Sequence, residues 1–535
     1  MIFVLMMAIP LCGALALMAP PARFLPGDAA VRRFGAAISG ATLLVAVSAL
    51  TAFDYGATST VQLEIDRAWA PAIDLRFHLG VDGISLPLVA LTALLTFLCF
   101  LYTLKHPPAG GRIRLLTALL LVLEVGLLGT FTALDLILFF VFFEVVLIPM
   151  YVVIILWGGP GRRAAAYKFI LYTLLGSGLL LAGMLLVGVT AGTLDMTELA
   201  ARHGSGVTRG VQITAFALMG LGFAVKAPMW PLHTWLPDAH TEAPTVGSVL
   251  LAGVLLKMGT YGLIRVALPL APEGAEFWAP WLGLLAVIGI IYGSLACLAQ
   301  RDLKRMIAYS SVGHMGFVLL GIATLTPVGV NAALFGNIAH GLITGLLFFL
   351  AGAVKDRWGT TDLTALGGGL LGTAPRLASL LTFASIASLG LPGLAGFWGE
   401  MLALLGAYRP HADLPRETFV TFMVVAAIGA VLTAAYFLRL LATLTHGRAD
   451  GVTARRPVTP APEGSAPPLP EGSAAPAGTE PEASPAHAPA REAAITLPEY
   501  AAWTPLIALT LLVGLWPKTL LDVTTAPVRA LFGGG

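Results

Sequence analysis

Six ionisable side chains lie inside long apolar stretches of this sequence, where water is scarce. They are Glu144, Lys226, Lys257, His314, His340 and Glu400. A charge at the centre of a bilayer costs at least about 2.5–3.5 kcal/mol, so such a residue needs a partner or water and suggests a function. Carboxyl, amino and imidazole groups all exchange protons. The six residues are therefore predicted to form a proton relay.

Each of these residues also has a structural interpretation. Glu144 and Lys226 are compatible with a static buried ion pair, and His314 or His340 with a core histidine bonded to a backbone carbonyl. The whole set favours a relay, because acids, lysines and histidines recur at similar depth in successive apolar segments. A carboxylate that moves toward or away from Lys226 would also change the affinity of that lysine for a proton.

Two other charges lie in apolar segments without a clear assignment. Glu124, in LLLVLEVGLLGTF, has no evident partner in the sequence. It is compatible with a position facing lipid headgroups or another subunit, and equally with a place in the relay. Arg265 lies toward the outer end of its segment and is expected to extend its guanidinium to the membrane surface.

Prolines interrupt two of the apolar segments beside these charges. Pro228 and Pro231 follow Lys226 within five residues, and Leu391-Pro392-Gly393 precedes Glu400. Proline removes a backbone donor and frees a carbonyl, and in lipid such a break survives only where protein or cavity water satisfies the freed groups. Lys226 is therefore expected to face water or protein.

The composition indicates an all-α polytopic membrane protein. Of the 535 residues, 57% are hydrophobic and 11% are charged, against about 25% charged in soluble domains. Runs of about 20 apolar residues are needed to cross the hydrocarbon core. Fourteen such runs are predicted to be transmembrane helices, beginning near Ile2, Phe34, Ile84, Leu115, Leu134, Ala165, Val211, Val246, Trp278, Met306, Val328, Leu377, Phe419 and Tyr500.

The basic residues orient these helices. Of the 31 lysines and arginines, 20 fall in one set of alternate loops, 8 in the other set, and 3 (Lys226, Lys257 and Arg265) within helices. Loops rich in Lys and Arg stay in the cytoplasm. Both termini are therefore predicted on the extracytoplasmic side of a bacterial plasma membrane.

The two proline breaks predict an internal repeat. They fall in helices seven and twelve, an odd number of helices apart, so those helices run in opposite directions. Interrupted helices in corresponding positions are typical of repeated transporter folds. We predict N-terminal helices in residues 1–112, inverted five-helix repeats in 113–268 and 269–448, and a last helix in 495–535. Residues 449–494, rich in Pro, Ala and Glu, should be a disordered cytoplasmic loop, either a docking tail or a tolerated insertion.

Other classes of function find little support. Cys12, Cys99 and Cys297 lie singly in apolar runs, which excludes a disulfide framework, a zinc site or an iron–sulfur site. The net charge of +2 gives no basis for nucleic-acid binding. No metal or cofactor site is expected in this chain.

Five motifs resemble the antiporter-like membrane subunits of respiratory complex I (NADH:quinone oxidoreductase). They are GVDGISLPLVALTALLT from Gly80, FFEVVLIPMYVVIILWG from Phe142, GFAVKAPMWPLHTWLPDAHTEAPTVGSVLLAGVLLKMGTYGLIR from Gly222, RDLKRMIAYSSVGHMGF from Arg301, and SLGLPGLAGFWGE from Ser388. The combination of LPDAHTEAP with LLKMGTYG is most similar to the M-type subunits. The sequence departs from this pattern in its longer loop at 449–494 and in Glu124, where an uncharged polar group is expected.

The resemblance implies a role in a redox-driven proton pump. Glu144 and Lys226 would gate a half-channel in the first repeat. Lys257, His314 and His340 would carry the proton along a central axis, and Glu400 would release it. NADH, FMN, iron–sulfur clusters and quinone would bind in partner subunits. L-type and N-type subunits would pack against this chain in the lipid bilayer.

Three alternatives remain open at this point. The chain could serve a multi-subunit cation/proton antiporter, which would share the glutamate, the lysine and the broken helices. It could belong to a proton-pumping membrane hydrogenase. It could also be a structural scaffold, which predicts that Lys226→Ala leaves proton pumping intact.

Overall fold

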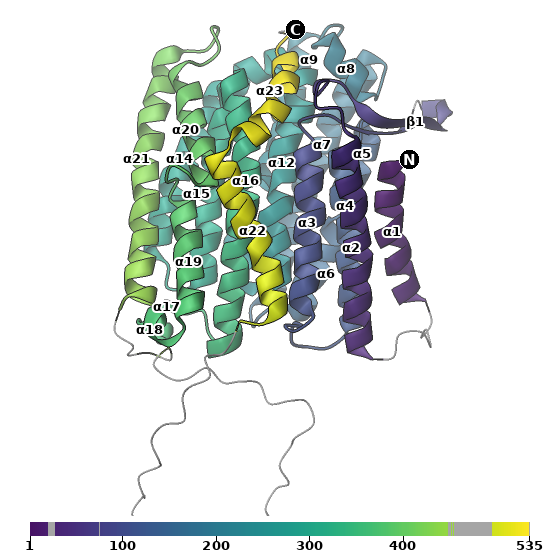
Figure 1. The fold of residues 1–535 in the computed structure, drawn as a ribbon. Coiled ribbons are helices and arrows are strands. Elements are labelled where there is room, and N and C mark those ends of the chain that lie inside the picture. Colours follow the sequence, from purple (N-terminus) through teal and green to yellow (C-terminus); the bar gives the residue numbers. More distant parts are fainter. Residues whose placement is uncertain (20–26, 74, 448–450, 452, 454–494, 534–535) are drawn as a thin grey trace, which may run out of the picture.

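The computed structural model describes residues 1–19, 27–73, 75–447, 451, 453 and 495–533. The predicted loop at 449–494 lies outside these residues, apart from Gly451 and Thr453. Within them the helices run side by side as one bundle, and both chain ends lie toward the same end of it (Figure 1). The expectation of a mostly helical membrane protein is confirmed.

The first quarter of the chain holds four long helices and a hairpin. The helices are α1 (Ile2–Met18), α2 (Asp28–Ala52), α3 (Leu86–Thr103) and α4 (Ile113–Thr132). Strands β1 (Gln62–Ala70) and β2 (Leu75–Val81) pair antiparallel, with Asp66 opposite His78. The hairpin lies at the end of the bundle where the chain begins and ends (Figure 1).

The next segment carries three of the six predicted relay residues. It contains α5 (Leu136–Val145), α6 (Leu147–Trp157), α7 (Arg162–Ala191), α8 (Met196–Arg202), α9 (Arg209–Lys226) and α10 (Trp235–Glu242). One long helix, Thr245–Leu270, follows and is divided into α11 (Thr245–Leu250), the π-helical turn η2 (Leu251–Leu255), α12 (Leu256–Gly262), the π-helical turn η3 (Leu263–Ala267) and α13 (Leu268–Leu270).

The remaining relay residues lie in the following segment. Its elements are α14 (Pro272–Ala299), α15 (Leu303–Ala323), α16 (Pro327–Trp358), α17 (Leu363–Leu366), α18 (Leu370–Thr373), α19 (Pro375–Ser388), α20 (Ala395–Tyr408), α21 (Arg416–Leu440) and the π-helical turn η4 (Leu441–Thr445). After the loop come α22 (Leu497–Leu515) and α23 (Lys518–Leu531).

Eleven helices in the described part of the chain are long and apolar enough to cross a membrane. The other three predicted segments are also helical, but each is short or interrupted. Helix α1 has 17 residues, α9 ends at Lys226, and α19 is separated from α20 by residues 389–394. The count of fourteen spans therefore stays a prediction.

Prolines explain where the helices are interrupted. The break between α5 and α6 at Val146 precedes Pro149, which has no N–H to bond the carbonyl of Val145. The predicted breaks lie at the end of α9, before Pro228, and between α19 and α20, around Pro392. Gly390 and Gly393 adopt φ of 73° and 92° in the second break, a conformation that glycine accepts without strain.

The helices differ sharply in burial. The helix Thr245–Leu270, α15 and α16 are almost wholly buried within the chain, whereas only 28% of the apolar part of α2 and of α21 is buried. Exposed apolar side chains such as Leu174 and Val431 are compatible with contact to lipid or to a neighbouring subunit. The central helices carry Lys257, His314 and His340, so the fold places these three residues away from its outer surface.

Two short backbone bridges recur in the two halves. Asp135 caps α5 and bridges Asp195, which caps α8. Asp302 caps α15 and bridges Asp362, which caps α17. Helix α8 lies at one end of the bundle and α17 at the opposite end (Figure 1).

Candidate functional site: buried acids, lysines and histidines

Glu144 is the second-last residue of the first apolar half-helix, α5. Its Oε1 accepts a hydrogen bond from the hydroxyl of Ser177 in α7. The side chain is half-buried. Because Pro149 interrupts the backbone hydrogen bonds just beyond this residue, Glu144 lies beside a weak point of its helix.

Lys226 is the last residue of α9 and is 2% exposed. Its Nζ lies 4.8 Å from the ring centroid of Phe143, within the range of a cation–π interaction. In the described part of the chain Nζ has no hydrogen-bond partner. A buried ammonium that is satisfied only by a ring face is well suited to bind a water molecule or a carboxylate.

Glu144 and Lys226 do not form the ion pair that the sequence suggested. In the described part of the chain no carboxylate oxygen lies within 4.0 Å of Lys226 Nζ. Successive residues of a helix point in different directions, so Phe143 faces Lys226 while Glu144 faces Ser177. The interpretation as a static ion pair is therefore wrong for this structure.

Lys257 and His340 contact one another at the centre of the bundle. Lys257 Nζ lies 2.6 Å from His340 Nδ1 and donates to the carbonyl of Ala252. Lys257 is fully buried and His340 is 5% exposed. Ala252 lies in the π-helical turn η2. Such turns shift the backbone hydrogen bonds and often occur at functional sites, and here the turn supplies a carbonyl to the lysine.

His314 continues the series toward Glu400. The ring centroids of His314 and His340 are 5.9 Å apart. His314 Nδ1 lies 3.0 Å from Glu400 Oε1, and its Nε2 lies 2.9 Å from Ser388 Oγ. Four of the predicted residues, Lys257, His340, His314 and Glu400, thus lie in one series from α12 to α20, with a gap between the two histidines.

A small cavity adjoins this series. Its volume is about 30 Å³, and it is lined by His314, His340, Ser388 and Glu400 together with apolar residues. This volume is sufficient for about one water molecule with several polar partners. A water molecule there would connect the two histidines, whose ring nitrogens are not within direct hydrogen-bond distance of each other.

A close helix contact brings the two parts of the site near each other. Gly259, one half-turn after Lys257, packs on the end of α9. A Cβ at Gly259 would lie 2.6 Å from the backbone nitrogen of Ala227 and 2.6 Å from the carbonyl oxygen of Phe223. Only glycine allows this approach. It sets the helix that carries Lys257 directly against the residue that follows Lys226.

Two histidines behind the first break were not predicted as site residues. His240, in α10, is fully buried and stacks on Phe348 with ring centroids 4.6 Å apart. His233 is 2% exposed. Within the described residues neither ring has a hydrogen-bond partner. The sequence feature that could have identified them is their position between two apolar segments, in PLHTWLPDAHTEAP.

The two unassigned residues each have a polar partner inside the protein, an aspartate for Arg265 and a serine hydroxyl for Glu124. Arg265 Nη1 lies 2.5 Å from Asp82 Oδ2, and the arginine side chain is only 12% exposed. Glu124 is fully buried, and its Oε1 accepts a hydrogen bond of 3.1 Å from Ser39 in α2. Neither contact could be inferred from spacing, since the partners are more than 80 residues apart.

A second ionisable cluster lies outside the helices that could span a membrane. His78 Nδ1 lies 2.7 Å from Asp195, and its Nε2 lies 2.7 Å from Glu64. Burial lowers the pKa of His78, but the bonds to Asp195 and Glu64 outweigh burial and leave that pKa above its ordinary value. Burial raises the pKa of Asp195, but bonds from His78 and Thr197 hold it well below its usual range.

Comparisons with known proteins agree with this architecture. Residues 133–433 match the family model described as NADH:quinone oxidoreductase/Mrp antiporter, TM. A NADH-quinone oxidoreductase subunit M of Rhodobacter capsulatus is 44% identical over 416 residues, which are 76% of this chain and 78% of that protein.

Solved structures resemble the whole chain. A chain of the respiratory complex I from Thermus thermophilus with bound NADH is 29% identical, with a TM-score of 0.80 and 99% of each chain covered. A chain of the Mrp complex from Dietzia sp. DQ12-45-1b has the same TM-score at 23% identity, covering 99% of this chain and 97% of that one, which shows the fold alone. The chain belongs to the NADH:quinone oxidoreductase/Mrp antiporter family of membrane proteins.

Proposed function

We propose that this chain is a proton-translocating membrane subunit of a redox-driven NADH:quinone oxidoreductase. The observation that carries the proposal is the series Lys257, His340, His314 and Glu400, in which proton-exchanging groups touch or nearly touch across central helices. Proton relays need such groups at hydrogen-bond spacing or one water apart. The relatives named as NADH-quinone oxidoreductase subunit M support the assignment of this chain to a redox-driven complex.

In this proposal the six residues have separate roles. Glu144 and Lys226 gate a half-channel: in the structure they are apart, and a movement of Glu144 from Ser177 toward Lys226 would raise the proton affinity of the lysine. Lys257, His340 and His314 carry the proton along the centre of the bundle. Glu400 then accepts the proton from His314 and releases it.

We further propose that residues 113–268 and 269–448 are inverted repeats within a fourteen-helix fold. Corresponding features support this arrangement. Each half has an aspartate-capped helix bridged to a second aspartate-capped helix, and these bridges lie at opposite ends of the bundle. Each half also has a helix interrupted near a proline, at the end of α9 and between α19 and α20, and a last long helix with a π-helical turn.

The expected setting follows from this function. The basic loops would face the cytoplasm and both termini the outside of a bacterial plasma membrane. L-type and N-type antiporter-like subunits would pack against the exposed apolar helices. NADH, FMN, the iron–sulfur clusters and quinone would be held by other subunits, which transfer the electrons.

The test is to measure proton pumping and NADH oxidation together in membranes that carry Glu144→Ala. We expect both rates to fall together, since a tightly coupled pump stalls when one channel is blocked. The matched control is Glu417→Ala, which changes an exposed glutamate of α21. Unchanged pumping and oxidation in Glu144→Ala would show that the glutamate has only a structural role.

A second candidate function is a subunit of a multi-subunit cation/proton antiporter. The similarity in fold to a chain of the Mrp complex supports this second candidate. Membranes of the source organism would then show sodium-for-proton exchange without NADH. Proton pumping that requires NADH and quinone and is indifferent to sodium would exclude this candidate.

A further inference from the structure

The largest cavity described in this chain lies at the end of the bundle opposite the termini. Its volume is about 910 Å³, within the range of small-molecule sites. It lies among the loop after α3, the loop between α6 and α7, and the start of the helix Thr245–Leu270. This is the end that carries most of the basic loop residues. None of the six predicted relay residues lines it.

The walls of this cavity carry an excess of positive charge. Five cationic side chains line it, Arg112, Arg162, Arg163, Lys304 and Lys355, against the two acids Glu242 and Asp356. The formal charge of the cavity is therefore +3 without His106. Such an excess inside a concave site attracts anions more strongly than the same charges on a flat surface.

The cations of the cavity are not neutralised by carboxylates. In the described part of the chain none of the five forms an ion pair within 4.0 Å. Lys304 is 2% exposed and donates only to the carbonyl of Ala243, at 2.6 Å. By contrast Lys168, Arg305 and Arg357, nearby on the same end, all pair with an aspartate or glutamate.

The two acids already have other partners. Glu242 accepts a hydrogen bond from the backbone N–H of Gly161. Asp356 accepts from the hydroxyl of Tyr102 and lies 3.2 Å from His106 Nδ1. Burial lowers the pKa of His106, but Asp356 and Glu499 raise it to about 9, so the ring is cationic at neutral pH and offsets Asp356.

Two long helices begin at the cavity with cations in place of anions. Helix α4 begins after Arg112 and α7 begins at Arg162 and Arg163, and neither has an acidic residue in its first turn or a side-chain cap. The N-terminus of a helix carries partial positive charge and free N–H groups. The arginines repel this partial positive charge of the helix. An anion bound between the arginines and the helix ends would offset the repulsion.

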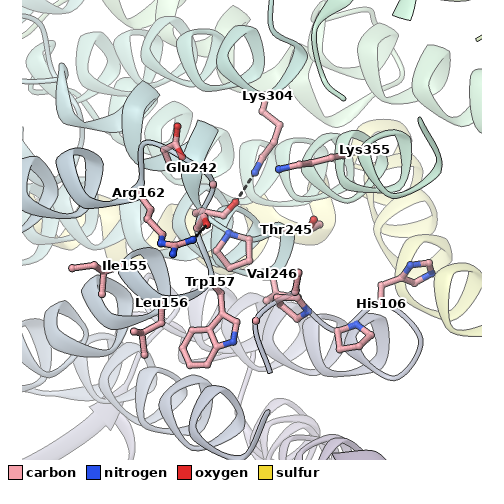
Figure 2. A pocket seen from close by; sticks show the side chains of 18 of the residues that line it. His106, Ile155, Leu156, Trp157, Arg162, Glu242, Thr245, Val246, Lys304 and Lys355 are labelled. Atoms are coloured by element: carbon pink, nitrogen blue, oxygen red, sulfur yellow. Dashed lines mark hydrogen bonds between the residues drawn. The ribbon is translucent and has the colours of Figure 1, made fainter. Parts of the chain in front are cut away.

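Part of the cavity wall is apolar, with Arg162 beside it. Figure 2 shows Lys304 and Lys355 on one side of the pocket, and Ile155, Leu156 and Trp157 on the other. The indole of Trp157 is held by a hydrogen bond to the carbonyl of Gly111. A cavity at the end of a helix bundle that combines several cations with apolar side chains suits a ligand with a phosphate and an acyl chain.

We propose that this cavity is a binding site for a phosphate-bearing anion, with Arg112, Arg163, Lys304 and Lys355 as its cationic ligands. Anionic phospholipid and soluble phosphate share this chemistry. The apolar wall favours the phospholipid, whose anionic forms are concentrated in the cytoplasmic leaflet. The site is independent of the proton relay and would tie the loops at this end of the bundle to the membrane surface.

The first test measures acylation of Lys355 in the intact complex in phosphatidylcholine vesicles, with mass spectrometry as the readout. The vesicles are used alone, with added phosphatidylglycerol, or with added inorganic phosphate. We expect phosphatidylglycerol to slow labelling of Lys355 and to leave Lys105, an exposed lysine of the same end, unchanged. Protection by inorganic phosphate alone would assign the site to a soluble anion. Equal labelling in all three conditions would overturn the proposal.

The second test uses Arg163→Gln with Lys355→Gln, which removes two exposed cations of the rim and leaves buried Lys304 in place. We expect affinity for phosphatidylglycerol to fall about 30-fold, at the usual contribution of each cation near an anionic surface. The matched control is Arg33→Gln with Arg376→Gln, two exposed cations of the same end outside the cavity. An equal loss of lipid in both double variants would mean that only the general surface charge matters, and would also overturn the proposal.

Discussion

The two buried ionisable regions of this chain are built from similar groups but differ in how these groups are connected. In the first region Glu144 bonds Ser177 while Lys226 lies over the ring of Phe143, so acid and base are separated. In the second region Lys257, His340, His314 and Glu400 form a series with short gaps. Under the proposed function a proton would pass along the second region with one water molecule, whereas the first region would require a movement or more water.

This difference suggests a division of labour. A gate must be able to interrupt a pathway, and a carboxylate with an alternative partner next to a helix break can do so. A conduit needs only close, exchangeable groups. Under the proposed function Glu144 and Lys226 would therefore control the pathway, and the second region would conduct. The following predictions test that assignment, from the largest expected effect to the smallest.

Lys257→Met should have the largest effect, because it removes the first group of the connected series. We expect proton pumping to fall about 100-fold or more, the usual contribution of a proton-transfer group. Pumping is measured by dye quenching in inverted vesicles, with NADH oxidation recorded in parallel. Lys105→Met, at an exposed lysine, is the control. Normal pumping in Lys257→Met would remove this lysine from the path.

Gly259→Ala should disturb the contact between the two regions. Its Cβ would meet the backbone of α9 at 2.6 Å, so one helix must shift. We expect a loss of about 1–3 kcal/mol in the free energy of unfolding, as for other overpacked sites. Thermal unfolding of the full chain in detergent gives the measurement. The control is Gly289→Ala in α14, where the nearest atom would be at 3.7 Å and where alanine favours the helix.

Ser177→Ala, compared with Ser388→Ala, should show whether the two regions have different functions. It removes the hydrogen bond that holds Glu144 away from Lys226, a contact of about 1 kcal/mol. We expect a several-fold change in pumping rate, which Ser177→Thr restores. Ser388→Ala should have a smaller effect, since Glu400 still contacts His314. Equal effects of the two alanine variants would contradict the distinction between gate and conduit.

His78→Gln should have the smallest effect and should depend on pH. The folded-state pKa of His78 lies above its unfolded value, so its stabilisation is complete below about pH 6.5 and is lost as pH rises through the folded-state pKa. The pKa of Asp195 is depressed, so its contribution exists above about pH 4 and is lost as pH falls through its folded-state value.

The measurement is the difference in Tm between wild type and His78→Gln. We expect this difference to be largest at about pH 5–6 and to shrink toward about pH 9. His203→Asn, at an exposed histidine, should give no such trend. A difference in Tm that does not vary with pH would show that His78 acts only by packing.

Much of this site could be predicted from residue types and their order. Apolar runs located the helices, and prolines located the breaks at Lys226 and before Glu400. The cost of burying charge singled out Glu144, Lys226, Lys257, His314, His340 and Glu400. These conclusions needed only local sequence, because hydrophobicity and the missing N–H of proline act where the residue stands.

The partners of these residues were decided by tertiary structure. Glu144 faces Ser177 and not Lys226, and Arg265 pairs with Asp82. Lys257 donates a hydrogen bond to a carbonyl of a π-helical turn. Helices that are apolar on nearly every side give no periodic signal for which face meets which neighbour. Rotation and register are then set by close packing between distant segments, such as that at Gly259. The sequence by itself thus determined which groups lie inside apolar helices, and the packing of the helices decided which of them contact one another.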